Sequence, residues 1–349
     1  MGNLVRRAAV NTDADGQPEP EEIVSNTNAI TRRALGRLAG PAALALSMGP
    51  GRAWAAGKRL AYLTPGLDLP FWRTLAKGIE DVAKENGGTS TTYDSHNSAQ
   101  TQLQNAQDAI AKQTDGIIIS PTDSSTAPSV IAAATRANIP VVIADIGTNS
   151  GEYVSFVISD NEKGAYGIGQ VLAKAMTAKG WNHNTVGLVT ISLARLNGKA
   201  RTGGFMKAMD EAGIKQAALS QMQTYTADET FKFVQDMLTA HPDMRGLFIE
   251  TDQPTIGALR ALKAAHRDKD VLVAAFDGIP EFIDLIASGQ IVGSGMQQPY
   301  LMGQSAAGAM FDHFAGKTPA KKILVPILVV DQENLKQTAP IVRKTTFGL

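Results

Sequence analysis

Polar and aromatic side chains recur where predicted strands end, and their types suit recognition of a polyhydroxylated molecule. Carboxylates accept hydrogen bonds from hydroxyl groups, an arginine donates in a fixed fork, and aromatic faces cover apolar C–H surfaces. Asp145 and Asp277 form the strongest pair, because each ends an apolar run shortly before a glycine. An aspartate in such a position can instead cap the next helix. The candidate ligand-binding residues are Phe71, Trp72, Ser120, Asp145, Arg201, Tyr225, Thr251, Asp277 and Gln297.

The elements that would position these residues alternate between strand and helix. Apolar runs rich in β-branched residues predict strands, and apolar residues spaced by three and four predict helices. Ligands of open parallel sheets bind beyond the carboxyl ends of the strands, where the candidates lie. The pattern predicts strands at 59–64, 89–93, 116–120, 140–144, 153–158, 185–190, 218–224, 246–250, 271–276, 291–296 and 323–330. It predicts helices at 71–86, 99–113, 126–138, 162–179, 199–213, 228–239, 254–265, 280–288 and 299–314.

The order of these elements repeats within the chain. The run GIIIS leads into Asp123 and is followed, one helix later, by PVVIA and Asp145. In the second half, GLFIE leads into Asp252 and is followed, one helix later, by VLVAAF and Asp277. Strands alternating with helices of this length indicate βαβ units and mostly parallel sheets. The sequence therefore predicts an α/β fold with two similar, doubly wound parallel-sheet lobes.

Composition and missing motifs exclude several classes of protein. Hydrophobic residues make up 44% of the chain, which is too many for a disordered protein. Lys+Arg and Asp+Glu both total 33, and no basic run occurs, which argues against a nucleic-acid partner. The absence of cysteine excludes thiolate metal sites and thiol nucleophiles. No nucleophile elbow, phosphate-binding loop or metal-ligand spacing of histidines occurs, so we expect no catalytic residue, metal or cofactor.

Residues 1–55 have the features of a leader for export. Arg32 and Arg33 precede a short apolar stretch at 38–48, and Ala53-Trp54-Ala55 forms a small-x-small signal before Ala56. This order is typical of a cleaved signal peptide, and the paired arginines resemble a twin-arginine signal. The general secretory route, a short amphipathic helix and a membrane anchor are the alternatives, although spanning a bilayer needs about 20 apolar residues. We expect cleavage near Ala55/Ala56 and a soluble mature protein in the periplasm.

Motifs along residues 58–330 resemble those of a known family. They are PFW at 70–72, PTD at 121–123, ANIPVV at 137–142, SDN at 159–161, RTGGF at 201–205, LTAHPD at 238–243, GALRAL at 257–262 and FDG at 276–278. In this order and spacing the chain resembles the periplasmic solute-binding proteins of ABC importers, of the ribose-binding, type I sugar class. The resemblance implies two lobes joined by three hinge strands, with a monosaccharide or polyol bound between them.

The resemblance also implies lobe boundaries, partners and a mechanism. The N-terminal lobe would comprise 56–158 and 299–326, the C-terminal lobe 159–298 and 327–330, and 331–349 would be a partly ordered tail. Ligand binding would favour hinge closure, and the closed protein would dock on an ABC permease at the inner membrane. A chemoreceptor is a second partner compatible with this role. Sugar contacts would fall on Phe71 and Trp72 by stacking, and on Asp145, Arg201, Tyr225, Asp277 and Gln297.

This chain departs from the ribose-type pattern at four positions. Leu69 and Ser120 stand where that pattern has asparagine, Ile146 stands where it has arginine, and Thr251 also replaces an asparagine. A site built on buried polar partners discriminates strongly between ligands that do and do not match them. We therefore expect that ribose itself is not the ligand, and that another pentose or hexose, a deoxy sugar or a polyol is.

Two other classes of protein share parts of this pattern. A sugar sensor of the LacI class has the same two lobes, but it would need a basic helix-turn-helix where this chain has its leader. An exported α/β carbohydrate-active enzyme would need a positioned acid–base pair or a metal at the strand ends. Asp145 and Asp277 are the only evident pair for that role, and no nucleophile accompanies them, so a binding protein remains the main interpretation.

Overall fold

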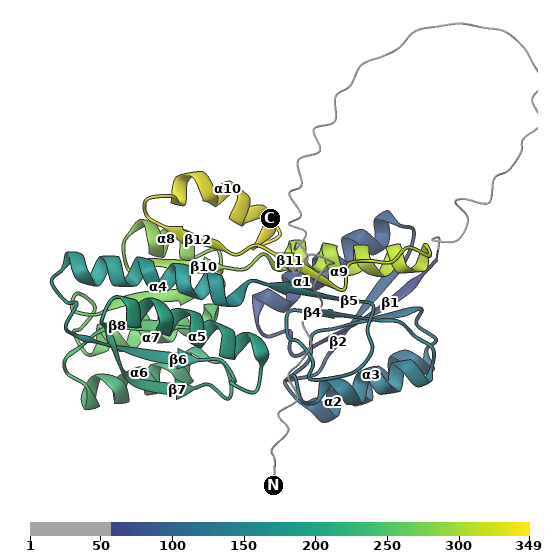
Figure 1. Ribbon diagram of the computed structural model, residues 1–349, viewed down its shortest axis with the longest axis horizontal. Coiled ribbons are helices and arrows are strands. Elements are labelled where there is room, and N and C mark those ends of the chain that lie inside the picture. Colours follow the sequence, from purple (N-terminus) through teal and green to yellow (C-terminus); the bar gives the residue numbers. More distant parts are fainter. Residues whose placement is uncertain (1–56) are drawn as a thin grey trace, which may run out of the picture. The chain divides into compact units, whose positions relative to one another are not determined.

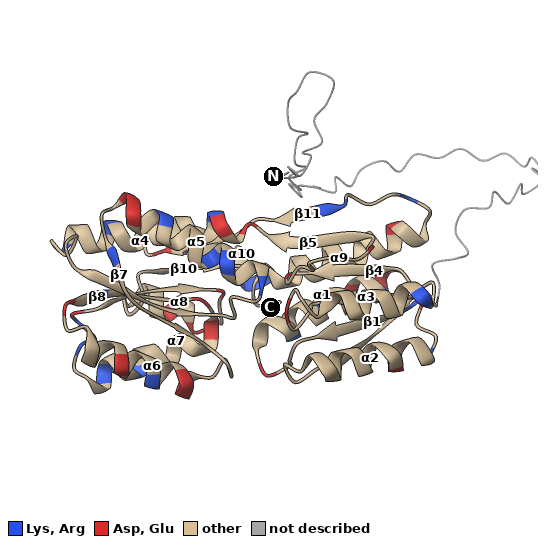
Figure 2. Cartoon of the chain, turned by 60° about the horizontal axis from the view of Figure 1, so that its bottom comes forward, with Lys and Arg blue, Asp and Glu red and all other residues tan. Residues whose placement is uncertain are grey.

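A computed structural model describes residues 57–349, and these form two lobes, each built around a β-sheet (Figure 1). The predicted leader at 1–55 and its cleavage site lie outside the described residues. The predicted fold class, two similar α/β lobes with parallel-sheet cores, is confirmed. Charged side chains lie mainly on helices and loops, and the strands carry them only at or next to their ends (Figure 2). Between 57 and 349, no helix combines the length and the hydropathy that crossing a membrane requires.

The N-terminal lobe contains the sheet β11-β5-β4-β3-β1-β2, in which all neighbouring strands are parallel. Every residue of the two central strands β3 and β4 is buried, as expected where helices cover both faces of a sheet. The strands are β1 (Arg59–Thr64), β2 (Thr89–Asp94), β3 (Gly116–Ile119), β4 (Val141–Ala144), β5 (Ser155–Ser159) and β11 (Lys322–Val325). The helices are α1 (Pro70–Glu85), α2 (Ala99–Ala111), α3 (Ala127–Arg136) and α9 (Pro299–Phe314).

The C-terminal lobe repeats this plan with the sheet β12-β10-β9-β8-β6-β7. Its strands are parallel except for β12, which is antiparallel to β10. The strands are β6 (Thr185–Thr190), β7 (Lys215–Gln221), β8 (Met244–Ile249), β9 (Leu272–Phe276), β10 (Gly293–Met296) and β12 (Leu328–Asp331). The helices are α4 (Asn161–Ala178), α5 (Leu196–Glu211), α6 (Ala227–Ala240), α7 (Asp252–Ala264), α8 (Phe282–Ala287) and α10 (Leu335–Thr345).

The chain passes between the two sheets three times, after β5, after β10 and after β11. The last passage divides the single strand predicted at 323–330 into β11 and β12, which belong to different sheets. Pro326 lies between them, and its missing N–H cannot continue a ladder of backbone hydrogen bonds. Its carbonyl oxygen accepts a hydrogen bond of 2.7 Å from Gln298 Nε2, which ties the second and third passages together.

The C-terminal tail differs from the sequence-based expectation. Residues 331–349 were expected to be only partly ordered, but 335–345 form α10, which packs against β12, α8 and α9. Val342 is fully buried, and Thr346 Oγ1 donates a 2.8 Å hydrogen bond to the carbonyl oxygen of Gln297. Pro340 lies inside the helix and breaks the sequence pattern that would predict one. The tail is therefore part of the folded protein, and it bonds to the backbone of the candidate site residue Gln297.

Helices α1 and α9 approach each other closely because each carries a glycine at the crossing point. A Cβ at Gly78 would lie 2.2 Å from the carbonyl oxygen of Tyr300, and a Cβ at Gly303 would lie 2.1 Å from that of Leu75. Such distances leave room for no side chain larger than hydrogen. This contact fixes α9, which follows the second passage, against α1, which carries the candidate aromatic residues Phe71 and Trp72.

Candidate ligand-binding site

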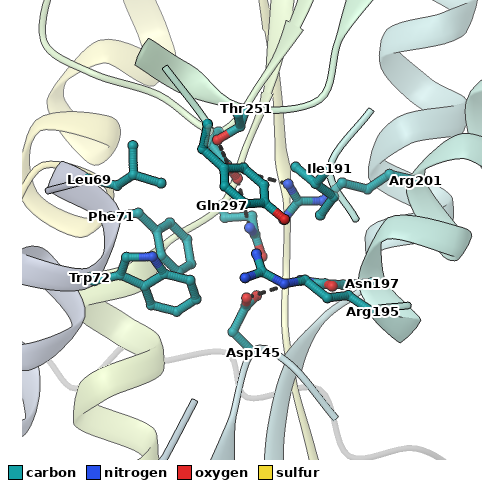
Figure 3. Close-up of a pocket in the computed structure, with 12 residues that line it drawn as sticks. Leu69, Phe71, Trp72, Asp145, Ile191, Arg195, Asn197, Arg201, Thr251 and Gln297 are labelled. Atoms are coloured by element: carbon teal, nitrogen blue, oxygen red, sulfur yellow. Dashed lines mark hydrogen bonds and ion pairs between the residues drawn. The ribbon is translucent and has the colours of Figure 1, made fainter. Parts of the chain in front are cut away.

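A narrow cavity of about 20 Å³ lies between the two lobes, at the carboxyl ends of the strands (Figure 3). Residues of both lobes line it, as predicted for ligands of parallel sheets. The lining residues that the sequence predicts are Phe71, Trp72, Asp145, Arg201, Tyr225, Thr251, Asp277 and Gln297. The ninth candidate, Ser120, is fully buried and does not line the cavity. Its Oγ lies 3.1 Å from the hydroxyl of Tyr62, so it belongs to the interior of the lobe.

The aromatic side of the cavity comes from the first turn of α1. Pro70 occupies the first position of the helix, where its missing N–H costs nothing. Phe71 and Trp72 follow, with ring centroids 4.7 Å apart and planes at 83°, an edge-to-face pair. Both side chains are less than a tenth exposed, and both line the cavity. Their packing holds two aromatic surfaces ready for an apolar ligand face.

Asp277 is the centre of a hydrogen-bond network on the opposite side. Its Oδ2 accepts from Arg201 Nη1 and from Thr251 Oγ1, both at 3.2 Å, and its Oδ1 accepts from Gln297 Nε2 at 2.7 Å. The ion pair with Arg201 is almost completely buried. The backbone of Asp277 has φ of 62°, in the left-handed region that residues other than glycine rarely adopt. A site that maintains such a conformation commonly serves a function.

Arg201 is held in place on every side. Its Nε donates to Asn161 Oδ1 and its Nη1 to the carbonyl oxygen of Glu250, both at 2.8 Å. The guanidinium group also lies over the ring of Phe276, 4.2 Å from the centroid. These contacts fix the charged fork in one orientation, so it can donate to a ligand without first losing conformational freedom.

Asp145 occupies the equivalent position in the N-terminal lobe and also has a positive φ, of 63°. Its Oδ2 accepts a 3.0 Å hydrogen bond from Asn197 Nδ2 of the C-terminal lobe. Burial raises the pKa of Asp145 to about 6, an effect that the charge of Arg201 partly opposes. Within residues 57–349, its Oδ1 and the Oε1 of Gln297 are buried without a hydrogen-bond partner. Both atoms are acceptors, and ligand hydroxyl groups could satisfy them.

The cavity also contains residues that the sequence analysis missed. They are Leu69, Ile191, Arg195 and Asn197. Ile191 follows β6, Arg195 is the N-cap residue of α5, and Asn197 lies in the first turn of that helix. This junction of β6 and α5 corresponds to the junction of β1 and α1 in the other lobe. The internal repeat was therefore the signal that could have found them. One strand-end aspartate bonds to the backbone instead, since Asp123 Oδ1 accepts from the backbone N of Ser125 and Thr126, ahead of α3, and does not line the cavity.

Two further carboxyl groups lie directly behind the site. Glu250 directly follows β8, and its side chain accepts from the backbone N of Ile191 at 3.1 Å and from Thr202 Oγ1 at 2.6 Å. Burial raises the pKa of Glu250 to about 8 and that of Asp252 to about 7, and the charge of Asp277 adds to the second shift. Glu250 is therefore largely protonated at neutral pH, which limits the negative charge behind the cavity.

We expect Glu250→Gln to remove a pH dependence of stability. The folded pKa of about 8 exceeds the ordinary value of 4.5, so between these values the folded chain binds more protons than the unfolded one. The free energy of unfolding of the native protein therefore falls as pH rises through this window. The amide oxygen can accept from the backbone N of Ile191 and the amide nitrogen can donate to Thr202 Oγ1, so both contacts remain without a charge. The variant should match the native protein near pH 4.5 and exceed it above pH 7, by at most about 1.4 kcal/mol per pH unit.

Urea unfolding at pH 5, 7 and 8.5 measures this difference. Glu152→Gln is the matched control, because Glu152 is exposed and the same charge is lost. Equal pH profiles for Glu250→Gln and the native protein would show that Glu250 is not protonated by burial.

Comparison with known proteins agrees with this fold. Residues 60–318 match the family described as periplasmic binding protein domain. The ribose import binding protein of Escherichia coli is 32% identical over 244 residues, which cover 70% of this chain and 80% of that protein. The D-apiose import binding protein of Paraburkholderia graminis is 30% identical over 266 residues, covering 76% and 83%. A periplasmic solute-binding protein of Actinobacillus succinogenes, solved with bound D-allose, has a TM-score of 0.73 at 25% identity, covering 80% and 99%.

Two lobes with parallel sheets, three passages between them and a cavity at the strand ends define a solute-binding protein, and this chain belongs to the periplasmic binding protein family. Within that family it is a type I sugar-binding protein of ABC importers. The relatives found are binding proteins rather than enzymes.

Proposed function

We propose that the mature protein binds a monosaccharide or polyol in the cavity between the lobes and delivers it to an ABC permease. The observation that carries this proposal is the pairing of two opposed surfaces. Phe71 and Trp72 offer aromatic faces, while Asp145 and Gln297 offer buried acceptor atoms without partners. A sugar or polyol presents both an apolar C–H face and a set of hydroxyl groups, so it matches both surfaces at once.

Ligand contacts with both lobes would couple binding to hinge closure. Asp145 belongs to one sheet and Asp277 to the other, so a ligand that bonds to both favours the arrangement that brings them together. The three passages between the sheets are the natural hinge. The leader at 1–55, its cleavage near Ala55/Ala56 and the periplasmic location belong to this proposal, as does docking on the permease.

The lining residues favour a ligand other than ribose. Leu69 and Ile191 give the wall apolar positions, and Ile146 is fully buried in the core instead of reaching the ligand as an arginine would. An apolar wall leaves hydroxyl groups facing it without partners, which costs affinity. The ribose, D-apiose and D-allose of the relatives define the range to test, and a deoxy sugar or a ligand with fewer hydroxyl groups fits this wall best.

A thermal-shift screen of the mature chain tests the proposal. The panel contains D-ribose, D-apiose, D-allose, other pentoses and hexoses, deoxy sugars and polyols. A ligand at about 100 times its Kd should stabilise the folded protein by about 2.7 kcal/mol, which raises Tm by several degrees. Trp72→Ala should reduce that shift strongly because it removes a stacking surface. Trp181→Ala, which changes an aromatic residue outside the cavity, should retain it.

Absence of a shift across the whole panel would contradict a sugar or polyol ligand. A shift with ribose larger than with any other sugar would contradict the specificity that we propose and leave the sugar-binding role intact.

A further inference from the structure

A short segment at the start of α5 connects the C-terminal lobe to the N-terminal lobe. Arg195 Nε donates a 2.8 Å hydrogen bond to the carbonyl oxygen of Thr122, in the loop after β3. Its Nη2 donates at 2.9 Å to Asn97 Oδ1, in the loop after β2. One guanidinium group thus joins two loops of the opposite lobe by direct hydrogen bonds. Neither acceptor is a charged group, and neither bond involves a ligand.

The two residues that follow make further contacts of the same kind. The backbone N of Leu196 donates to Ser124 Oγ at 3.3 Å, and Asn197 Nδ2 donates to Asp145 Oδ2 at 3.0 Å. A Cβ at Gly147 would lie only 3.0 Å from Cδ1 of Leu196, so this leucine packs on the backbone of the N-terminal lobe. Residues 195–197, which we call the latch segment, therefore contact the loops after β2, β3 and β4.

The energetic terms of these contacts oppose one another. Arg195 is only 6% exposed, and none of the ion pairs among residues 57–349 involves it. Taking an unpaired guanidinium out of water is costly, and hydrogen bonds to neutral acceptors offset only part of that cost. The ring of Tyr225, 4.9 Å from the guanidinium, adds a cation–π contact. Nearly balanced terms favour a contact that forms and breaks readily, as a hinge protein requires.

Arg195 also lines two neighbouring cavities. It lines the inner cavity together with Asp145 and Arg201. It also lines a larger outer cavity of about 460 Å³, whose wall includes His96, Gln223 and Thr226. Leu69, Trp72 and Tyr225 line both cavities as well. Of these shared residues, Arg195 is the one whose side chain also bonds to both Thr122 and Asn97 of the opposite lobe.

We propose that the latch segment closes the two lobes on each other in the absence of ligand, and that Arg195 controls how fast a bound ligand leaves. The first half of this proposal needs no ligand at all. The second half rests on the proposed function. Because a ligand binds tightly only to the closed arrangement, the population closed beforehand also sets the apparent affinity.

Distances between spin labels measured without ligand test the first half. The chain has no cysteine, so Gln107→Cys in α2 and Gln235→Cys in α6 provide two unique labelling positions, one in each lobe (Figure 1). Both residues are exposed. In the full mature chain, the distance distribution should contain a closed population. Arg195→Gln should lower the ratio of closed to open molecules on the order of fivefold, as expected for the loss of two hydrogen bonds.

Lys199→Gln is the matched control, because it removes the same charge from an exposed position of the same helix. Its distribution should equal that of the native chain. A native distribution without a closed population, or a ratio in Arg195→Gln within twofold of the native one, would overturn the proposal. These outcomes do not depend on whether the ligand is a sugar.

Stopped-flow release of the sugar identified by thermal shift tests the second half. Arg195→Gln should accelerate release on the order of fivefold or more, with a smaller change in the association rate. An unchanged release rate would overturn the role of Arg195 as a gate. Loss of affinity with an unchanged ligand-free distribution would assign Arg195 to direct ligand contact and overturn the latch.

Discussion

Replacing Asp277 with asparagine should abolish sugar binding almost completely. The carboxylate accepts from Gln297 through Oδ1 and from both Arg201 and Thr251 through Oδ2. Asparagine can keep the bond from Gln297 through its amide oxygen. Its NH2 group then faces Arg201 and Thr251, which are donors themselves. The buried guanidinium of Arg201 also loses its counter-charge, and breaking such a pair typically costs about 3–5 kcal/mol. We expect Kd to rise by at least about 100-fold.

Titration calorimetry with the sugar identified by thermal shift measures this change. Asp236→Asn is the matched control, because Asp236 lies exposed on α6 and loses the same charge. Circular dichroism spectra at the temperature of the titration separate loss of binding from loss of fold. A folded Asp277→Asn protein whose Kd stays within threefold of the native value would show that Asp277 does not organise the site.

Gly303→Ala should destabilise the protein more than any exposed substitution. The added methyl group would lie 2.1 Å from the carbonyl oxygen of Leu75 and 3.0 Å from the backbone N of Ile79. Backbone atoms in the middle of a helix cannot move aside, so α1 and α9 must separate. Overpacking of this kind costs about 1–3 kcal/mol and occasionally more. Because both helices belong to the core of the N-terminal lobe, we expect a loss at the upper end of that range.

Gly308→Ala provides the control within the same helix. A Cβ at Gly308 would meet nothing within 4 Å, so alanine should stabilise α9 by up to about 1 kcal/mol through its higher helix propensity. Urea unfolding of both variants therefore should give changes of opposite sign. Equal effects of the two substitutions would mean that the close approach of α1 and α9 does not limit residue size at position 303.

Much of the architecture could be predicted because apolar runs and their spacing are local signals. The runs GIIIS and VVIA are buried in the structure as predicted, and the strand at 185–190 has the predicted ends. The boundary at 323–330 could not be predicted in this way, because one apolar run supplies strands to two sheets. Only the position of Pro326 marks the change of sheet.

The site shows the same limit. Eight of the nine candidates line the cavity, because the ends of parallel strands converge there whatever the ligand is. Ser120 follows β3 in the same way, but its hydroxyl is paired with that of Tyr62. Arg195 and Asn197 were missed because the helix predicted at 199–213 begins at Leu196, so Arg195 is its N-cap and Asn197 lies in its first turn. Their partners belong to the opposite lobe, and no local pattern encodes that contact.

The last residues of the chain have a practical consequence for attaching reporters. Helix α10 packs on α8 and β12 of one lobe and on α9 of the other, and Gly348 lies close to Thr74 and Lys77 of α1. The carboxyl terminus therefore sits where the lobes pivot. An affinity tag fused there would hinder the motion of the lobes. An environment-sensitive dye at the exposed Leu349 would instead change its fluorescence when the lobes close.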